Sequence, residues 1–384
     1  MSDAVRSVLK NWFEHSRIES IQPIASGLSG AAVFRVSIAQ GQTWALKRYP
    51  LHTSLSRVDQ IHRVMVTAKN NGCDVVPELK RCGPKLGGPK RYDPGDAGVP
   101  NRYAIDDGQY VWELAQWIDG QPWREPATGT GLLVSDSAAA GDLAANAETE
   151  RRRHEAMLRG GSAIAVFHRS VRSLGTQLQA PPCVLTRQKR LKELGSQMDA
   201  IIASDLMQVE HLHLRFSLQT AIERFRADWN RVTSPLAATL AALSHESVET
   251  QIVLGDVHAE HIFFANSCAG DAVESCSVVG IIDFDAVRMD AAATDLARWI
   301  SSFLGECTDV HTAWHSVLAG YRLESSLDEQ QEVIAKSIVQ VSAWINLANW
   351  ATWLLLDHQN FSYDDEQIAQ RIDQWIRVID KLGR

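Results

Sequence analysis

The sequence lacks an excess of basic residues, a CxxC pair and any long apolar run. Its 384 residues include 38 Lys and Arg against 46 Asp and Glu, which gives a formal net charge of −8. This balance argues against nucleic acid as the main partner, because nucleic-acid binding usually requires a basic face. The six cysteines are scattered along the chain, a pattern typical of reduced thiols in a cytosolic protein.

A candidate membrane segment is also missing. The longest apolar stretch, Ala343 to Leu356, contains Asn346 and Asn349 and is too short to cross a bilayer. Residues 1–17 have no apolar core of signal-peptide length and instead show the spacing of an amphipathic helix. We therefore expect a cytoplasmic protein with no membrane partner. Nothing in the sequence indicates the oligomeric state.

The order of periodic segments predicts an α+β fold. After a first helix over 1–20, the β-type runs 32–36 and 43–47 predict a hairpin. A helix is expected over 56–70, and further strands include 109–117. We predict a small N-terminal antiparallel sheet with one helix, followed by a larger and mainly helical part.

The larger part contains one β-rich island, over 252–285, among segments with helical spacing. Residues 217–230 and 236–243 are among the segments that carry helix-type spacing. Two segments are irregular. Residues 83–98 are rich in Gly, Pro, Lys and Asp and predict a flexible loop, and the small residues of 126–147 predict a mobile insertion without chemistry.

The run Ser26-Gly27-Leu28-Ser29-Gly30 lies between two β-type segments. Glycine there permits a positive φ and lets backbone N–H groups approach an anion. Because a strand follows, the run is neither a Walker loop nor a dinucleotide fingerprint, and by itself a hairpin turn is the simpler interpretation. Alternation places Lys47 on the same strand face as Ala45, beneath this turn. A lysine there would neutralise phosphate oxygens, so the pattern favours a role for Lys47 in phosphate binding.

Two acidic motifs carry the strongest signal. Residues 254–264 (LGDVHAEHIFF) place an acid and two imidazoles between apolar strands, and 278–285 (VVGIIDFD) is an apolar strand that ends in two acids. A hairpin that presents Asp256, His261 and Asp283 would suit metal binding and proton transfer. The alternative is a capped hairpin with surface acids. Acids directly abutting such apolar strands make that alternative the weaker one.

Taken together, these motifs resemble the aminoglycoside phosphotransferase and choline and homoserine kinase-like family, the small-molecule relatives of protein kinases. The family segment H-G-D-x-H-x-x-N resembles 254–261, and its D-L-A turn resembles 295–297. Its metal-binding strand ends in an acid that matches Asp283. The run 111–120 (VWELAQWIDG) resembles the last sheet strand and the interlobe hinge. The resemblance extends over 24–305.

This resemblance implies a protein-kinase-like, two-lobed fold. The N-terminal nucleotide-binding lobe would cover 1–118, and the helical catalytic and substrate-binding lobe 119–384. The implied reaction moves the γ-phosphate of ATP to a hydroxyl of a small molecule, such as an amino alcohol, an amino sugar or a hydroxy amino acid. Partners would be a nucleotide and a small alcohol or amine, with no nucleic acid.

The resemblance also implies roles for single residues. Asp256 would be the catalytic residue that accepts or orients the acceptor's hydroxyl proton, and Asp283 and His261 would bind the metal. The implied nucleotide contacts are Gly27, Ser29, Gly30, Lys47, Ala115 and Trp117. The implied cofactors are ATP and Mg²⁺.

Three departures from the family pattern are visible. Leu254 replaces a histidine that is largely a packing residue. His261 replaces the metal-binding asparagine, and an imidazole favours softer metals, so Mn²⁺ or another divalent metal becomes an alternative to Mg²⁺. In the segment where the family has a helical glutamate partner for Lys47, Asp59 is the only acid, and its side chain is short.

A tryptophan-rich stripe near the C-terminus has two interpretations. Its members are Trp344, Leu347, Trp350, Trp353 and Leu354. Core packing is the simpler one. The other is an aromatic wall for a cationic amine, with Asp357, Asp364 or Asp365 near it to bind an amino sugar.

Two other functions stay open on the sequence alone. A catalytically impaired pseudokinase would bind nucleotide and act through a partner, which the missing asparagine and the uncertain partner of Lys47 favour. A transition-metal hydrolase would use Asp256, His258, His261 and Asp283 without nucleotide.

Overall fold

The computed structural model describes residues 2–14, 17–24, 30–83, 103–123, 139–265, 276–305, 309–361 and 363–383. Two compact units make up the chain. We call Met1–Gly120 with Val279–Asp285 the sheet unit, and Gln121–Val278 with Ala286–Arg384 the helical unit. The lobe boundary between residues 118 and 119 stays a prediction.

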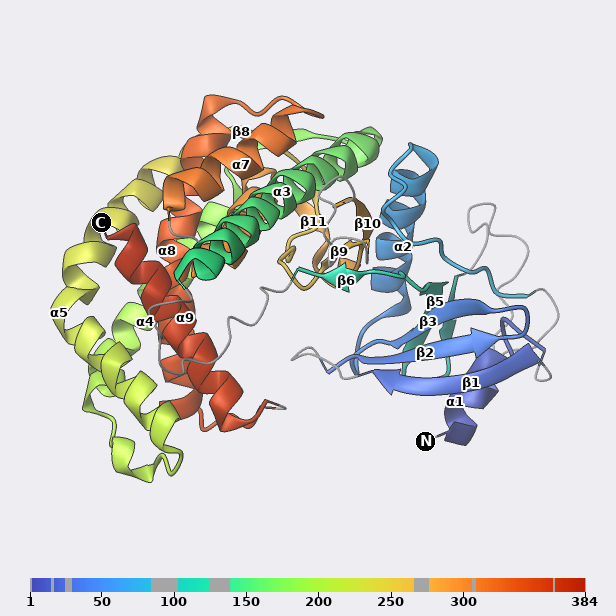
Figure 1. Ribbon diagram of the computed structural model, residues 1–384, viewed down its shortest axis with the longest axis horizontal. Helices are drawn as coiled ribbons and strands as arrows, with labels where there is room; N and C mark the ends of the chain where they lie inside the picture. Colours follow the sequence, from blue (N-terminus) through green and yellow to red (C-terminus); the bar gives the residue numbers. More distant parts are fainter. Residues whose placement is uncertain are drawn as a thin grey trace. The chain divides into compact units, whose positions relative to one another are not determined.

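The sheet unit is built on a five-stranded antiparallel sheet (Figure 1). Its strands, in spatial order, are β1 (Ile18–Ile24), β2 (Ala32–Ile38), β3 (Gln42–Arg48), β5 (Val111–Gln116) and β4 (Ala104–Asp106). The predicted hairpin is confirmed as β2 and β3, in which Phe34 lies opposite Leu46. Gln40 and Gly41 both have positive φ at its tip, which matches the twist of the two strands.

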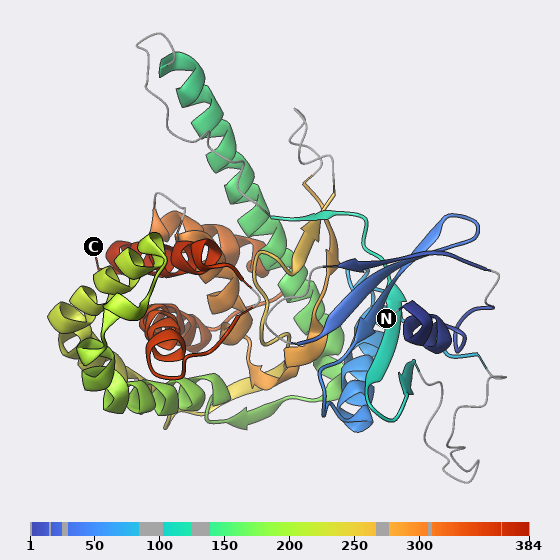
Figure 2. The same cartoon turned by 90° about the horizontal axis from the view of Figure 1, so that it is seen from below.

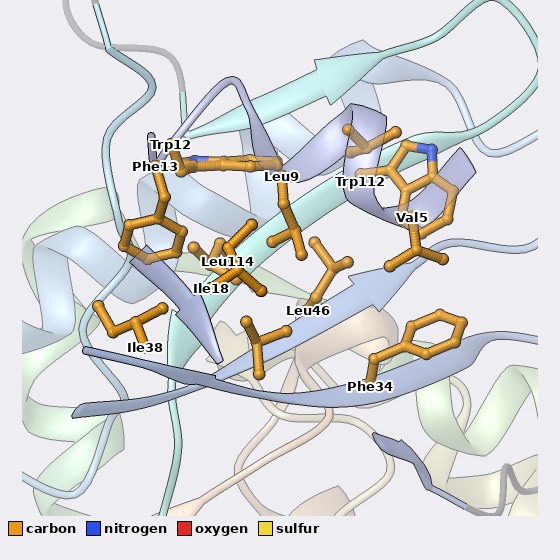
Figure 3. Packing of buried hydrophobic residues seen from close by; sticks show 12 residues of the cluster. Val5, Leu9, Trp12, Phe13, Ile18, Phe34, Ile38, Leu46, Trp112 and Leu114 are labelled. Carbon is orange, nitrogen blue, oxygen red and sulfur yellow. The ribbon is translucent and has the colours of Figure 1, made fainter. Parts of the chain in front are cut away.

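Helix α1 (Ser2–Leu9) covers one face of this sheet. Figure 3 shows Val5 and Leu9 of the helix packed with Phe34, Leu46 and other sheet residues in one apolar cluster. Trp12 and Phe13, just after the helix, belong to the same cluster. The helix is shorter than predicted, because residues from Ile18 onward pair with β2 instead of extending it.

Helix α2 (Leu55–Asn70) lies on the opposite face. Ser54 caps its first turn by accepting from the amide of Arg57. Side chains alternate along a strand, so Lys47 on β3 and Glu113 on β5 face away from the apolar cluster. His62 of α2 contacts Glu113, which places this helix on the polar face of the sheet. In the turned view of Figure 2, α1 and α2 can be seen as two distinct blue helices.

The helical unit contains seven long helices in its described residues. They are α3 (Ala139–Val171), α4 (Pro182–Ala203), α5 (Leu212–Leu243), α6 (Ala293–Leu304), α7 (Val310–Arg322), α8 (Glu329–Leu355) and α9 (Asp365–Leu382). Helices α3 and α7 run side by side (Figure 1). Helix α8 packs on α4, α5, α6 and α9 and forms the centre of this unit.

Short strands complete the helical unit. Strands β7 (Gln177–Gln179), β8 (Val248–Val253) and β11 (Arg288–Ala291) form one antiparallel sheet, and β6 (Gln121–Pro122) pairs with β9 (Ile262–Phe264). Strand β10 (Val278–Ile281) carries the chain from the helical unit into the sheet unit. The predicted β-rich island therefore holds β8, β9 and β10.

One prediction about this unit was wrong. Residues 139–147, predicted as part of a mobile insertion, belong to α3. Helix α5 runs without a break through Pro235, although a proline inside a helix removes one backbone hydrogen bond. Buried residues on both sides of the proline, among them Trp229 and Leu240, keep the helix in register with its neighbours. Most of the loop predicted at 83–98 lies outside the described residues.

None of the described helices is both long and apolar enough to cross a membrane. Four cysteines fall within the described residues, and all four are free thiols: Cys73, Cys82, Cys183 and Cys276.

Candidate active site

Lys47 forms two ion pairs in the sheet unit. Its ammonium Nζ lies 3.0 Å from Asp283 Oδ1 and 2.6 Å from Asp285 Oδ1. The lysine is 14% exposed, and the two aspartates are about one-third exposed. The structure therefore joins two residues that the sequence singled out, Lys47 and Asp283, although 236 positions separate them in the chain.

The backbone after β10 is shaped to present these acids. Asp283 has φ of +60°, in the left-handed region that non-glycine residues rarely adopt. Aspartate tolerates this region better than most residues. The backbone carbonyl of Asp285 accepts a hydrogen bond from Arg57 on α2, at 2.8 Å. Backbone strain of this kind is concentrated at functional sites.

A third carboxylate lies next to this pair. Glu113 is directly opposite Lys47 in the register of β3 and β5 and is 7% exposed. Its Oε2 accepts a hydrogen bond from the Tyr49 hydroxyl at 2.7 Å and lies 2.7 Å from His62 Nε2. The Lys47 ammonium lies 5.1 Å from the centre of the Tyr49 ring. Glu113 is thus held between a strand tyrosine and a helix histidine.

The pKa values in this cluster follow from burial and charge. Burial by itself lowers the pKa of Lys47, but the carboxylates of Asp285, Asp283 and Glu113 outweigh it and raise the pKa above its ordinary value. Burial raises the pKa of Asp285, and Lys47 opposes this only in part. Burial also opposes ionisation of Glu113, but hydrogen bonding and charge at His62, with Lys47 and Tyr49, lower its pKa. Lys47 therefore stays charged at neutral pH.

The uncertain partner of Lys47 is now resolved. Asp59, the only acid of α2, is exposed and is not among the ion-pair partners of Lys47. Strand β5 supplies the buried acid instead, and α2 contributes His62. Glu113 does not stand out in the sequence because it lies inside an apolar run, VWELAQ. The alternation of that run, with Trp112 and Leu114 facing the apolar cluster, was the available signal.

The other predicted nucleotide residues are only partly described. Gly30 has φ of +72°, which favours glycine there, whereas Gly27 and Ser29 lie outside the described residues. Ala115 is buried in β5, opposite Ala45. The amide of Trp117 donates to the carbonyl of Thr43 at 3.3 Å. A nucleotide contact at Trp117 would therefore use other groups than this amide.

Asp256 lies in the helical unit, on the loop that follows β8. Two backbone amides at the start of this loop, those of Leu254 and Gly255, each donate to Asp295 at 2.7 Å. Asp295 is fully buried in α6 and also lies 2.9 Å from His168 Nε2. Asp295 therefore has a structural hydrogen-bonding role. The loop is thereby fixed at its base.

Glycine at position 255 is required by space as well as by backbone conformation. Its φ is +81°, and a Cβ there would collide with the carbonyl of Ala286 and the side chain of Arg288. Further along the loop, the amide of Ala259 donates to the Ser302 hydroxyl at 3.1 Å. Helix α6 therefore fixes the loop on both sides of Asp256.

His261 lies at the end of the same loop. Its Nδ1 is 2.8 Å from the backbone carbonyl oxygen of Asp256. Because a carbonyl can only accept, Nδ1 must donate, and a neutral ring then carries its lone pair on Nε2. Nε2 is a nitrogen through which histidines bind metals. The rings of His258 and His261 are 3.7 Å apart, and His258 Nδ1 accepts from the amide of Glu260, which supports a role in loop structure.

Asp256 also has an ion-pair partner that the sequence analysis missed. Nη1 of Arg298, on α6, lies 2.7 Å from Asp256 Oδ1. Both side chains are about two-fifths exposed. Arg298 directly follows the D-L-A run that begins at Asp295. Its position about one helical turn after Asp295 could have indicated that both side chains point toward the Asp256 loop. The guanidinium orients the carboxylate.

The C-terminal stripe is mainly core. Trp344 and Trp350 are each 5% exposed, and Trp344 packs against Phe225 and Trp229 of α5. Asp364 caps α9 in a capping box, so its carboxylate serves the helix. These contacts support the packing interpretation over the alternative of an aromatic wall.

Solved structures share this fold. A spectinomycin phosphotransferase bound to AMP has 10% identity, with 100% of this chain and 99% of that chain covered and a TM-score of 0.59. A microcompartment-associated aminopropanol kinase has 11% identity, coverage of 100% and 97%, and a TM-score of 0.57. Amicoumacin kinase in complex with AMP-PNP and Ca²⁺ has 12% identity, coverage of 99% and 93%, and a TM-score of 0.56. No curated protein sequence matches the chain.

The model of the phosphotransferase enzyme family matches residues 20–322. The chain belongs to this family. The matched range includes Lys47, Asp256, Asp283 and Asp295. The resemblance seen in the sequence and the expected protein-kinase-like α+β fold are both confirmed. This phosphotransferase is accordingly a small-molecule kinase by family.

Proposed function

We propose that this phosphotransferase moves the γ-phosphate of ATP to a hydroxyl of a small acceptor. The acceptor classes are the three expected from the sequence: an amino alcohol, an amino sugar or a hydroxy amino acid. The observation that carries the proposal is the charge cluster of Lys47, Asp283 and Asp285 in a chain of this family. Phosphoryl transfer needs such fixed charges more than covalent help from the protein.

The donor set suits a divalent cation. Asp283 and Asp285 offer carboxylate oxygens, the ligand type that Mg²⁺ and Mn²⁺ prefer. Asp283 would be the main ligand and His261, through Nε2, a second. When bound, the cation would neutralise negative charge on the phosphate oxygens. Use of nucleotide with a cation is supported by relatives bound to AMP, and to AMP-PNP with Ca²⁺.

The chain's own residues take separate roles in this proposal. Lys47 would contact the phosphate oxygens, and Glu113 would hold its ammonium in place from the neighbouring strand. Asp256 would accept or orient the hydroxyl proton of the acceptor, on a loop that Asp295 fixes. The remaining nucleotide contacts are proposed at Gly27, Ser29, Gly30, Ala115 and Trp117, with the amide of Trp117 excluded.

The test is a transfer assay with radiolabelled ATP across amino alcohols, amino sugars and hydroxy amino acids, in Mg²⁺ and in Mn²⁺. Asp256→Asn should lower kcat by a factor on the order of 10² or more, because general-base help is typically worth that much. Asp199→Asn, an exposed change on α4, is the control. Near-normal turnover by Asp256→Asn removes Asp256 from this role.

The same assay separates the two other functions. A pseudokinase would bind ATP in calorimetry and transfer nothing to any acceptor. A transition-metal hydrolase would be active with bound metal and unaffected by ATP. No observation in the described residues favours either function over the kinase.

A further inference from the structure

Two arginines of the helical unit contact the loop that carries Asp256, and a third, Arg187, hydrogen-bonds to the carbonyl of Cys183, whose amide donates to Asp290 beside Arg288. Arg298 pairs with Asp256 itself. Arg288, on β11, donates to the carbonyl of Gly255 at 3.4 Å and to Asp290 Oδ2 at 3.1 Å. Arg187, on α4, interacts electrostatically with both of these guanidiniums. One guanidinium thus contacts the proposed catalytic carboxylate, a second contacts its loop, and a third interacts with both of them.

Arg187 differs from the other two in its acceptors. Its Nε donates to the Ser342 hydroxyl of α8 at 2.8 Å, and its Nη1 to the carbonyl of Cys183 at 3.2 Å. Both acceptors are neutral oxygens. The Asp290 carboxylate favours the charge of Arg187, but Asp290 forms its ion pair with Arg288 and accepts from the amide of Cys183.

The charge of Arg187 is therefore poorly balanced. Burial, reinforced by the Arg298 and Arg288 guanidiniums, lowers the pKa of Arg187 to about 10. A guanidinium normally keeps a pKa above about 12 in proteins. A positive potential of this kind attracts an anion, and a planar guanidinium binds the two oxygens of a carboxylate or phosphate well.

We propose that Arg187, together with Arg298, binds an anionic group of the acceptor next to Asp256. The ligand is a hydroxyl-bearing molecule with a carboxylate or a phosphate, which selects the anionic members of the proposed acceptor classes: hydroxy amino acids, or amino sugars that already carry a phosphate. This inference rests on the proposed function, because it places the acceptor at Asp256. The packed state of Trp344 and the capping role of Asp364 agree with it, since both reduce the case for a cationic ligand.

Matched acceptor pairs test the charge requirement. L-homoserine against 3-aminopropanol, and L-serine against ethanolamine, differ only by the carboxylate. Glucosamine 6-phosphate against glucosamine tests a phosphate as the source of the anion. We expect the preferred acceptor to be an anionic member, with kcat/KM at least about tenfold above its partner, as expected for charge-assisted hydrogen bonds. Calorimetry with the same compounds, in the absence of ATP, measures binding independently of turnover.

Two variants assign the effect to Arg187. Arg187→Gln keeps hydrogen-bond donors and removes the charge, so it should abolish the preference, whereas Arg187→Lys should retain part of it. Arg190→Gln is the matched control. Arg190 lies about one turn further along α4 and donates to Asn349 of α8, but it is paired with Glu193. It should leave the preference unchanged, and thermal unfolding identifies any variant that fails to fold.

The outcomes separate this inference from the proposed function. Equal use of charged and uncharged acceptors, or a preference that survives Arg187→Gln, overturns the anion site and leaves the kinase assignment intact. Absence of anion binding in calorimetry also overturns it. Binding that depends on Arg187, without ATP-dependent transfer to any acceptor, supports the anion site and contradicts the proposed function.

Discussion

Lys47 and Glu113 lie directly opposite each other on the neighbouring strands β3 and β5. The glutamate is almost fully buried, and Tyr49 and His62 both contact its Oε2. The ammonium is therefore positioned by the sheet itself on one side and by Asp283 and Asp285 on the other. Each of the three carboxylates can therefore be tested by its own substitution.

Glu113→Gln tests the positioning role. The variant keeps the size of the side chain and removes the charge beside Lys47. We expect the KM for ATP to rise and kcat to fall, with a combined loss in kcat/KM on the order of tenfold or more, because the charge that attracts the Lys47 ammonium and the charge-assisted hydrogen bonds to Tyr49 and His62 are lost together. Glu19→Gln, on the exposed side of β1, should change neither constant. Unchanged kinetics in Glu113→Gln would show that Lys47 is positioned without it.

The pH dependence of stability has a defined sign at Glu113. Its pKa in the folded protein lies below the ordinary value of 4.5. The unfolded chain therefore binds the proton first, and Glu113 contributes stability that is present above about pH 4.5 and lost as pH falls through the folded value. Urea unfolding across that range should show a smaller acid-induced loss in Glu113→Gln than in the unmodified chain.

Asp285 contributes with the opposite sign. Its pKa is raised in the folded protein, so its contribution to stability decreases as pH rises through its ordinary value of 3.8 toward the folded value. Asp285→Asn removes this contribution and should make the net increase of stability between about pH 3 and pH 6 steeper. An unchanged slope would mean that Asp285 titrates as a solvent-exposed acid does.

Asp283 combines a backbone role with a proposed metal-binding role, and two substitutions separate them. Asparagine tolerates a positive φ nearly as well as aspartate, whereas alanine does not, at a cost of roughly 1–2 kcal/mol. We expect Asp283→Asn to retain stability but bind Mn²⁺–ATP weakly in calorimetry. Asp283→Ala should lose both. Tight Mn²⁺–ATP binding by Asp283→Asn would contradict its role as a metal ligand.

His261→Asn restores the residue type expected in the family. An amide oxygen suits Mg²⁺ better than an imidazole does. The ratio of activity in Mg²⁺ to activity in Mn²⁺ should therefore rise, by several-fold or more. His258→Asn, on the same loop, is the control. A ratio that stays constant would place His261 outside the metal site and leave it with its hydrogen bond to the Asp256 carbonyl.

The sequence allowed much of the fold and part of the site to be predicted, for physical reasons that differ between residues. Alternation along β2 and β3 was enough for the hairpin, and the link between Lys47 and Asp283 came from resemblance, since no local pattern connects residues so distant in the chain. The hydrogen bond from Arg187 to Ser342 could not be predicted from the sequence for the same reason. The segments 217–230 and 236–243, each with helical spacing, form one helix through Pro235 because packing on both sides outweighs one missing hydrogen bond.

The position of Glu113 on a strand has a consequence for control of the enzyme. In protein kinases the lysine's partner is carried by a helix, and movement of that helix switches catalysis on and off. Here a shift of α2 would remove His62 but leave Lys47 and Glu113 opposite each other on two hydrogen-bonded strands. We therefore expect an enzyme that lacks this kind of conformational switch. Its rate would be set by the concentration of its acceptor substrate.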